Sequence, residues 1–212
     1  MTNPDSALRD LVAAISTGDR DRIAKLLAQN PMIARSRFEV TNATRQSAKE
    51  NFVDAVKRYI YRGDTALHFA AAAYNAEVIA LLVCAGADVR AKNRLGDEPL
   101  HSACTGDPAS DHWKPDAQSA AIRALVNAGA DLGARNKTGV TPLHKAVRAR
   151  CAQAVGTLLE LGADPAILNG SSSTPLLLAR MNTGRRGSGL PAAKAQQREI
   201  LKLLERRLAE RK

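Results

Sequence analysis

The chain has 212 residues, of which 45% are hydrophobic, so it can bury a core as one domain or as two small ones. Aromatic residues make up only 3%, which argues against a β-sandwich and favours close-packed helices, because strands are rich in aromatic and β-branched side chains. The formal net charge is +10, but residues 180–212 carry ten Lys or Arg against three Asp or Glu while residues 63–179 are nearly neutral, which argues against a uniformly basic nucleic-acid groove.

Residues 1–36 contain two short apolar runs, Leu11–Ile15 and Ile23–Leu27, on either side of Gly18. Their spacing predicts two helices joined by a turn at the glycine. No basic segment followed by an apolar run begins the chain, so we expect no secretory signal and a cytoplasmic location. The longest apolar stretches, such as 77–87, are too short to span a bilayer, so we expect no membrane partner.

Residues 37–62 form a basic segment with six Lys or Arg against three Asp or Glu. Between residues 43 and 61, apolar side chains recur near helical spacing with cations between them, and the pattern predicts an amphipathic helix. These apolar side chains are Ala48, Phe52, Val56, Tyr59 and Ile60. The helix could pack its apolar side on the rest of the protein or contact a partner.

Residues 63–179 repeat one motif four times. The copies are GDTALHFA at 63–70, GDEPLHSA at 96–103, GVTPLHKA at 139–146 and SSTPLLLA at 172–179. The first three are each followed by an apolar run and by Gly-Ala-Asp at 86–88, 129–131 and 162–164. Gly63 and Gly96 are 33 residues apart, whereas Gly96 and Gly139 are 43 apart, so ten extra residues lie within one repeat, between Ala103 and Ala121.

Each part of the motif has a physical reason. Thr before Pro supplies a helix N-cap followed by proline at the first helical position, where its missing N–H costs nothing. Leu and Ala then recur on one helical face, and a second apolar stripe follows after a turn. Gly86, Gly129 and Gly162 suit the left-handed position that ends a helix.

Motif and period together resemble the ankyrin repeat. The resemblance implies an all-α solenoid in which each repeat has a short β-hairpin-like finger, an inner helix and an antiparallel outer helix. It makes residues 1–36 an N-terminal capping unit, 37–62 an inserted basic helix or finger, 63–179 the core repeats, and 180–212 a basic loop with a C-terminal capping helix. About five units result, and such stacks need polar caps.

Two further insertions interrupt the repeats. Residues 105–119 contain Trp113, the only tryptophan, in a polar loop, where it could be a binding hot spot or could fold back over neighbouring helix ends. Residues 181–194 are Gly/Ser-rich and basic, which is typical of a solvated linker.

The three repeated histidines, His68, His101 and His144, do not predict a metal site. Stacked helices lie roughly 8–10 Å apart, whereas zinc ligands converge to about 2 Å. The resemblance implies instead that each imidazole ties its repeat to the next. Three widely spaced cysteines suggest buried free thiols, and no catalytic motif occurs, so we expect neither a cofactor nor an enzyme.

The resemblance implies a non-catalytic monomer that binds a protein partner on its fingers and inner-helix face. Trp113 is an outlying candidate contact. The candidate strip comprises Arg90, Lys92, Arg94, Arg135 and Lys137 on fingers, and Phe69, Ser102, Lys145 and Arg148 on inner helices. Since most of these are basic, an acidic partner is expected. Nucleic-acid binding through residues 180–212, and a secreted effector or immunity-type inhibitor, remain as alternatives.

Overall fold

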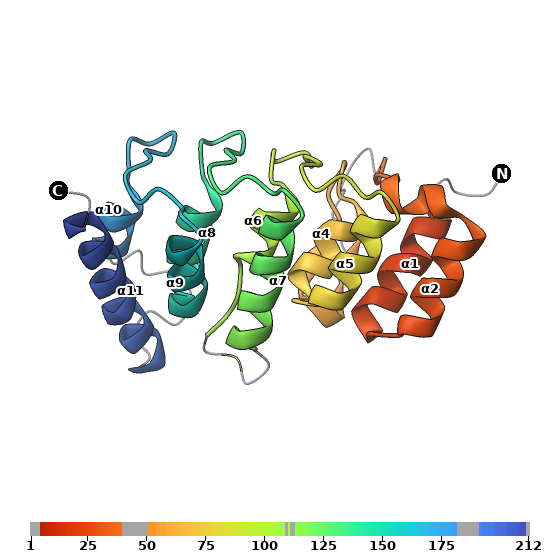
Figure 1. Cartoon of the computed structure of the whole chain (residues 1–212), viewed down its shortest axis with the longest axis horizontal. Helices are drawn as coiled ribbons and strands as arrows, with labels where there is room; N and C mark the ends of the chain where they lie inside the picture. The colour runs from red at the N-terminus through yellow and green to blue at the C-terminus, as the bar shows by residue number, and fades with distance from the viewer. Residues whose placement is uncertain (1–4, 40–50, 109, 111–112, 182–190, 211–212) are drawn as a thin grey trace.

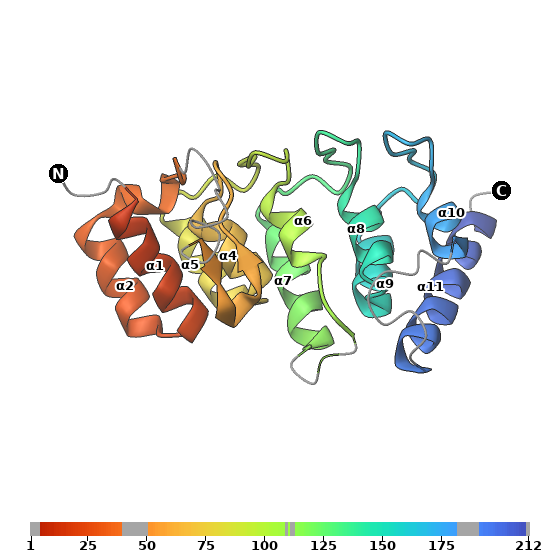
Figure 2. The same ribbon diagram turned by 180° about the vertical axis from the view of Figure 1, so that it is seen from behind.

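The computed structural model describes residues 5–39, 51–108, 110, 113–181 and 191–210. In this part of the chain, helices stack side by side along one axis, and the first and last of them lie at opposite ends (Figure 1 and Figure 2). One layer holds the inner helices, which are α1 (Ser6–Thr17), α4 (Ala66–Ala72), α6 (Pro99–Ala103), α8 (Pro142–Arg148) and α10 (Pro175–Arg180). The other layer holds the outer helices, which are α2 (Arg20–Gln29), α5 (Ala76–Cys84), α7 (Pro115–Asn127), α9 (Ala152–Glu160) and α11 (Pro191–Ala209). This arrangement confirms the all-α solenoid.

The buried core runs continuously between the two layers. Leu67, Leu100 and Leu143 project into it from consecutive inner helices and are at most 1% exposed. Ile79 and Ile122 meet them from the outer helices. Burying each such side chain contributes roughly 1.5–3 kcal/mol, and because each repeat packs only on its neighbours, stability depends on the unbroken stack.

A finger precedes each inner helix from α6 onward, and an asparagine side chain closes it. Asn93 Oδ1 accepts hydrogen bonds from the N–H groups of Leu95 and Asp97, and Asn136 and Asn169 repeat this pattern. Neighbouring fingers are joined by backbone bonds, for example from Gly170 N to Thr138 O. Gly139 has a φ of +70°, and a Cβ there would lie 2.6 Å from Gly170 N, so this position requires glycine.

From residue 51 onward, the basic segment before the second repeat is not the helix that its spacing predicts. After the 3₁₀ turn η1 (Pro31–Arg35), the described residues 51–61 form a hairpin of β1 (Phe52–Val53), η2 (Asp54–Val56) and β2 (Arg58–Tyr59). Its turn ends at Lys57, whose φ of 47° is left-handed and would interrupt a helix. The rest of the expected helix, residues 43–50, lies outside the described residues.

The other two insertions lengthen outer helices. Residues 115–119, expected within a loop, form the first turn of α7, with Pro115 at a position that needs no N–H donor. The end of the third insertion, from Pro191, is the start of α11. The intervening residues 182–190 lie outside the described part of the chain.

Candidate partner-binding surface

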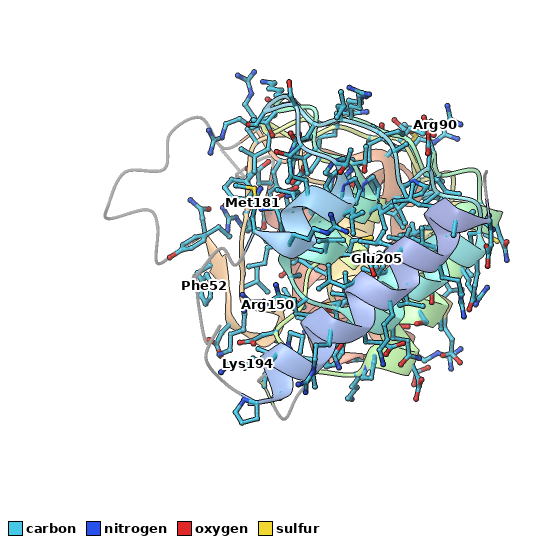
Figure 3. The ribbon with its side chains drawn as sticks, turned by 90° about the vertical axis from the view of Figure 1, so that its left-hand side faces the viewer. Phe52, Arg90, Arg150, Met181, Lys194 and Glu205 are labelled. Carbon is cyan, nitrogen blue, oxygen red and sulfur yellow. The ribbon has the colours of Figure 1, made fainter. Side chains whose placement is uncertain are left out.

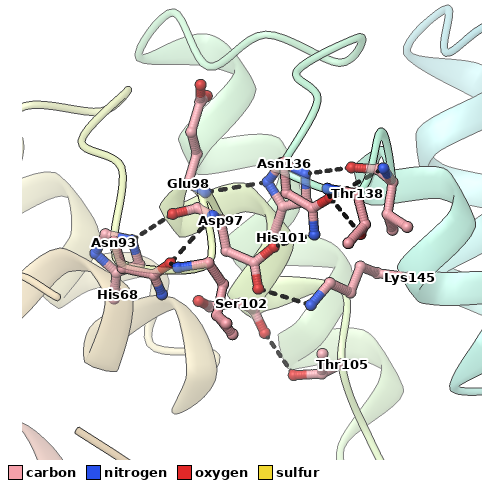
Figure 4. A network of polar contacts seen from close by, with 12 residues as sticks. His68, Asn93, Asp97, Glu98, His101, Ser102, Thr105, Asn136, Thr138 and Lys145 are labelled. Atoms are coloured by element: carbon pink, nitrogen blue, oxygen red, sulfur yellow. Dashed lines mark hydrogen bonds and ion pairs between the residues drawn. The ribbon is translucent and has the colours of Figure 1, made fainter. Parts of the chain in front are cut away.

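The repeated histidines connect one repeat to the next (Figure 4). His68 Nδ1 accepts from Thr65 N at 3.1 Å, and its Nε2 lies 3.0 Å from the backbone oxygen of Asp97 in the next finger. His101 and His144 contact Val140 O and Ser173 O in the same way, each at 3.0 Å. This geometry fits the neutral imidazole with its proton on Nε2. The expected structural role of these histidines is therefore confirmed.

Burial keeps these imidazoles uncharged. Desolvation lowers the pKa of His68 to about 4, against the opposing influence of the nearby Asp64 carboxylate. Burial lowers the pKa values of His101 and His144 as well. Within the described residues, no cluster of three or more His, Cys, Asp or Glu is arranged to hold a metal ion.

Beside the histidines, two buried aspartates each bind an asparagine and a cation. Asp64 accepts from Asn93 Nδ2 and from Arg58 Nη2, both at 2.8 Å. In the next repeat, Asp97 accepts from Asn136 Nδ2 at 2.8 Å and from Lys145 Nζ at 2.7 Å.

Lys145 decides the ionisation of Asp97. Burial by itself would raise the pKa of Asp97, but the Lys145 ammonium and the bonds from Lys145 and Asn136 lower it. The repeat that contains α8 has Val140 in place of this aspartate, so the pattern stops there.

The hairpin covers the inner-helix surface of the second and third repeats. The Arg58 guanidinium lies 5.5 Å from the ring centroid of Phe69 and donates to Ser102 Oγ at 2.5 Å. Both covered side chains are at most 2% exposed. The expectation that Phe69 and Ser102 face a partner is therefore wrong, because the inserted segment already occupies that position.

Most of the predicted basic residues are exposed to solvent. Lys92, Arg94, Arg135 and Lys137 are exposed on the fingers, and Arg148 is exposed on α8. Arg94 stacks on the Tyr61 ring at 5.3 Å, and Lys92 Nζ lies 3.7 Å from Glu98 Oε1. Lys145 is less accessible, since its side chain is 22% exposed and pairs with Asp97.

Arg90 belongs to the other side of the molecule. Its Nε donates to Gly129 O at 3.1 Å, just beyond the end of outer helix α7. A cation at this position satisfies a terminal carbonyl and complements the helix dipole. Viewed along the solenoid, Arg90 lies on the side opposite Phe52 and Arg150 (Figure 3), so it does not line the inner-helix face with the other cations.

Trp113 folds back onto the protein. Its Nε1 donates to Gln118 Oε1 at 3.0 Å, and the half-buried ring packs against the core. Gln118 also donates to the backbone oxygens of Ala103 and Thr105, so it fastens the inserted loop to both helices of its repeat. The ring borders a shallow groove of about 700 Å³ along α7, α9 and α11, away from the inner-helix face. Of the two interpretations of Trp113, this position favours the structural one.

The open part of the inner-helix side lies towards the C-terminal end of the solenoid. There a small notch lies between the ends of α8 and α10, with Gln197 and Ile200 of α11 behind it, and is bordered by Arg148, Arg150, Leu178 and Met181. Met181 is 50% exposed. Sequence reasoning missed the two apolar residues, although apolar side chains at the end of the last repeated motif, where no fifth motif follows, were a usable signal.

The cysteines differ from one another. Cys104 and Cys151 are buried, as expected, and burial raises both thiol pKa values, that of Cys151 to about 12. Cys84 is exposed, which corrects the expectation that all three are buried. None of the described helices combines the length and apolarity required to cross a membrane.

Comparison with known families agrees with this geometry. A family described as ankyrin repeats (3 copies) matches residues 11–110, and one described as ankyrin repeats (many copies) matches residues 125–179. The chain belongs to the ankyrin-repeat family. Ankyrin repeats are generally protein–protein interaction modules and are typically non-catalytic. The first match begins at Leu11, so it includes most of α1 and all of α2, which lack the repeated motif. No curated protein matches the chain.

Proposed function

We propose that this ankyrin-repeat protein binds an acidic segment of a partner protein along its fingers and the open part of its inner-helix face. The contacts would come from Lys92, Arg94, Arg135 and Lys137 on the fingers and from Arg148 on α8. Lys145 would contribute positive potential from the edge of this surface. Trp113 and Arg90 are left out of the proposal, because they lie elsewhere.

The observation that carries the proposal is a set of exposed cations on the fingers and on α8 of a nearly neutral repeat body. Neither Arg135 nor Lys137 forms an ion pair within the described residues, and the same holds for Arg148. Such cations keep their charge available to a partner, accelerate encounter and disfavour basic partners. Their energetic contribution would be largest where binding excludes water.

The C-terminal cations support nucleic-acid binding less well. On and beside α11, Arg180, Arg206 and Arg207 pair with Glu205 or Glu210, and Lys202 lies 4.0 Å from Glu199. These pairs reduce the positive field that a phosphate backbone would meet. No observation on the described residues therefore favours nucleic acid as a second candidate.

The test is affinity capture from the cell of origin with the triple charge reversal Arg94→Glu, Arg135→Glu and Lys137→Glu. Partner capture should be lost, while the thermal midpoint changes little. The matched control reverses Lys25, Lys114 and Arg198, which are exposed away from the fingers and change the net charge equally. Undiminished capture by the first variant, or equal loss in both, would contradict the proposal.

A further inference from the structure

The outward face of the hairpin displays two aromatic rings. Phe52 and Tyr59 pair across the strands, with ring centroids 4.8 Å apart and planes inclined at 57°. Side chains alternate along a strand, so their neighbours Val53 and Arg58 face the solenoid while these two rings face away. Tyr59 is 46% exposed and Phe52 is partly exposed, so the two paired rings form one aromatic patch that is open to solvent.

The hairpin is held firmly enough to present these rings in a fixed position. Arg58 bonds to Asp64 and to Ser102, and Ile60 N donates to Asn51 O at 2.7 Å. Asn51 in turn accepts from Arg9 Nη2 of α1 at 2.7 Å. An aromatic side chain on a rigid support loses little conformational entropy when it binds, which is why such residues serve as anchors.

The same side of the solenoid carries further binding features. Figure 3, which looks along the solenoid, places Phe52, Arg150 and Met181 on one side of the molecule. Towards the C-terminal end, the notch between α8 and α10 combines the apolar side chains of Leu178 and Met181 with the cations Arg148 and Arg150. A segment lying along this side would meet apolar surface at the hairpin, and cations together with apolar surface farther on.

We propose that the Phe52–Tyr59 pair is the apolar anchor of the binding surface, and that the partner is an acidic peptide segment carrying an aromatic or branched aliphatic side chain. That side chain would pack in the corner between the two inclined rings, and the acidic residues would extend over the cations of the fingers and α8. This inference rests on the proposed function, and it adds the kind of side chain that the partner must supply.

The inclination of the rings favours a peptide over a single-stranded nucleic acid. Bases stack on flat, open aromatic faces. Two rings inclined at 57° instead form a corner, which suits an aliphatic side chain or the edge of an aromatic ring. Binding of single strands through these rings is thus an outcome that would overturn the assignment.

The experiment selects binders of the full chain from a displayed library of random peptides about twelve residues long. Enriched peptides should be net acidic and should share an aromatic, Leu or Ile position. Their affinity for the double variant Phe52→Ser/Tyr59→Ser should fall at least about tenfold. The matched control is Leu81→Ser, which removes an exposed apolar side chain from outer helix α5 and should leave binding unchanged.

The outcomes separate this inference from the function on which it rests. Peptides that keep their affinity for the aromatic variant but lose it after the triple charge reversal would overturn the anchor and support the basic surface. Peptides that lose affinity in neither variant, or no enrichment at all, would overturn both. Retention of a labelled poly(dT) strand that depends on Phe52 and Tyr59 would also overturn the peptide assignment. Unchanged far-UV circular dichroism and thermal midpoint confirm that the aromatic variant is folded.

Discussion

Arg58 Nη2 lies 2.8 Å from Asp64 Oδ1, and this buried pair fixes an inserted hairpin to the inner-helix side of an ankyrin solenoid. The next repeat builds an equivalent pair between Asp97 and Lys145, but takes its cation from the following inner helix. The buried aspartate is thus a repeated feature, and its cation comes either from the inserted hairpin or from the next inner helix. Where the insertion supplies the cation, the surface is covered, and beyond the insertion it remains open.

Replacing Arg58 should destabilise the protein. Arg58→Met leaves the carboxylate of Asp64 buried with only Asn93 Nδ2 and Tyr61 N as partners, and we expect a loss of about 2–4 kcal/mol in the free energy of unfolding. Urea denaturation measures it. Lys57→Met is the matched control, because its pair with Asp54 is exposed and should contribute less than about 1 kcal/mol. The double variant Arg58→Met/Asp64→Asn should recover part of the lost free energy of unfolding. If its loss instead equals the sum of the losses of the two single variants, the two residues do not interact.

Stability should fall in mildly acidic solution because of the buried histidines. The pKa of His68 is about 4 in the folded protein and about 6.5 when unfolded, so between these values only the unfolded chain binds the proton. The pKa difference of His68 contributes about 3 kcal/mol to the free energy of unfolding. This stabilisation is fully present above pH 6.5 and is lost as the pH falls towards 4. His101 and His144 act in the same direction.

Urea denaturation between pH 7 and pH 4.5 measures this dependence. Asp97, whose pKa is lowered by Lys145, contributes at lower pH and does not mask the effect. In His68→Gln the amide can still donate to Asp97 O but does not titrate, so stability should depend less on pH. A slope identical to that of the wild type would contradict the assignment.

Two non-glycine residues in the left-handed conformation should respond oppositely to glycine. Arg150 has a φ of 58°, and its side chain forms no hydrogen bond or ion pair within the described residues, so Arg150→Gly should raise the free energy of unfolding by about 0.5–1 kcal/mol. Tyr74 has a φ of 55°, but its hydroxyl bonds to Thr105 O, so Tyr74→Gly should destabilise the protein. Thermal midpoints of the two variants test this. A higher thermal midpoint in both variants would mean that the contacts of Tyr74 contribute nothing to stability.

Gln118 should control both stability and the environment of the only tryptophan. Gln118→Ala removes the acceptor of the Trp113 indole N–H and the donor to Ala103 O, at a cost of about 1–3 kcal/mol. Trp113 emission should shift to longer wavelength as the ring becomes hydrated. Gln153→Ala, which removes an exposed amide, is the control and should change neither quantity. An unshifted emission maximum would show that Gln118 does not hold the ring.

The repeated part of the fold could be predicted because each repeat starts and ends its helices with the same residue types at the same positions. A Thr-Pro pair such as Thr141 and Pro142 starts an inner helix, and a glycine such as Gly162, with its left-handed φ of 99°, follows the end of an outer helix. His144 recurs at a fixed offset, so its contact with the next finger was readable from its position. The exposed cations of the fingers, such as Arg135, were predictable for the same reason.

The binding surface was predictable only in part. Phe52, Val56, Tyr59 and Ile60 fit a helical spacing, but in so short a segment the same residues also fit alternating strands. The hairpin forms because Arg58 contacts both the buried carboxylate of Asp64 and the hydroxyl of Ser102, and because Val53 packs on the core. Ser102 is 44 residues from Arg58 in the chain, so this contact depends on how the repeats stack. Trp113 likewise could not be placed without its partner Gln118.

By itself, the sequence determined the ankyrin repeat, its register and its chain of histidines, because these arise from contacts within a repeat or between neighbours at a constant offset. Only the tertiary structure decided which part of the inner-helix face is free. That depends on the partners of an insertion that lacks the repeated motif: Arg58 bonds to Asp64 and Ser102 and covers Phe69, while Arg148 stays exposed. Such contacts join unrelated positions of the chain, and no local pattern encodes them.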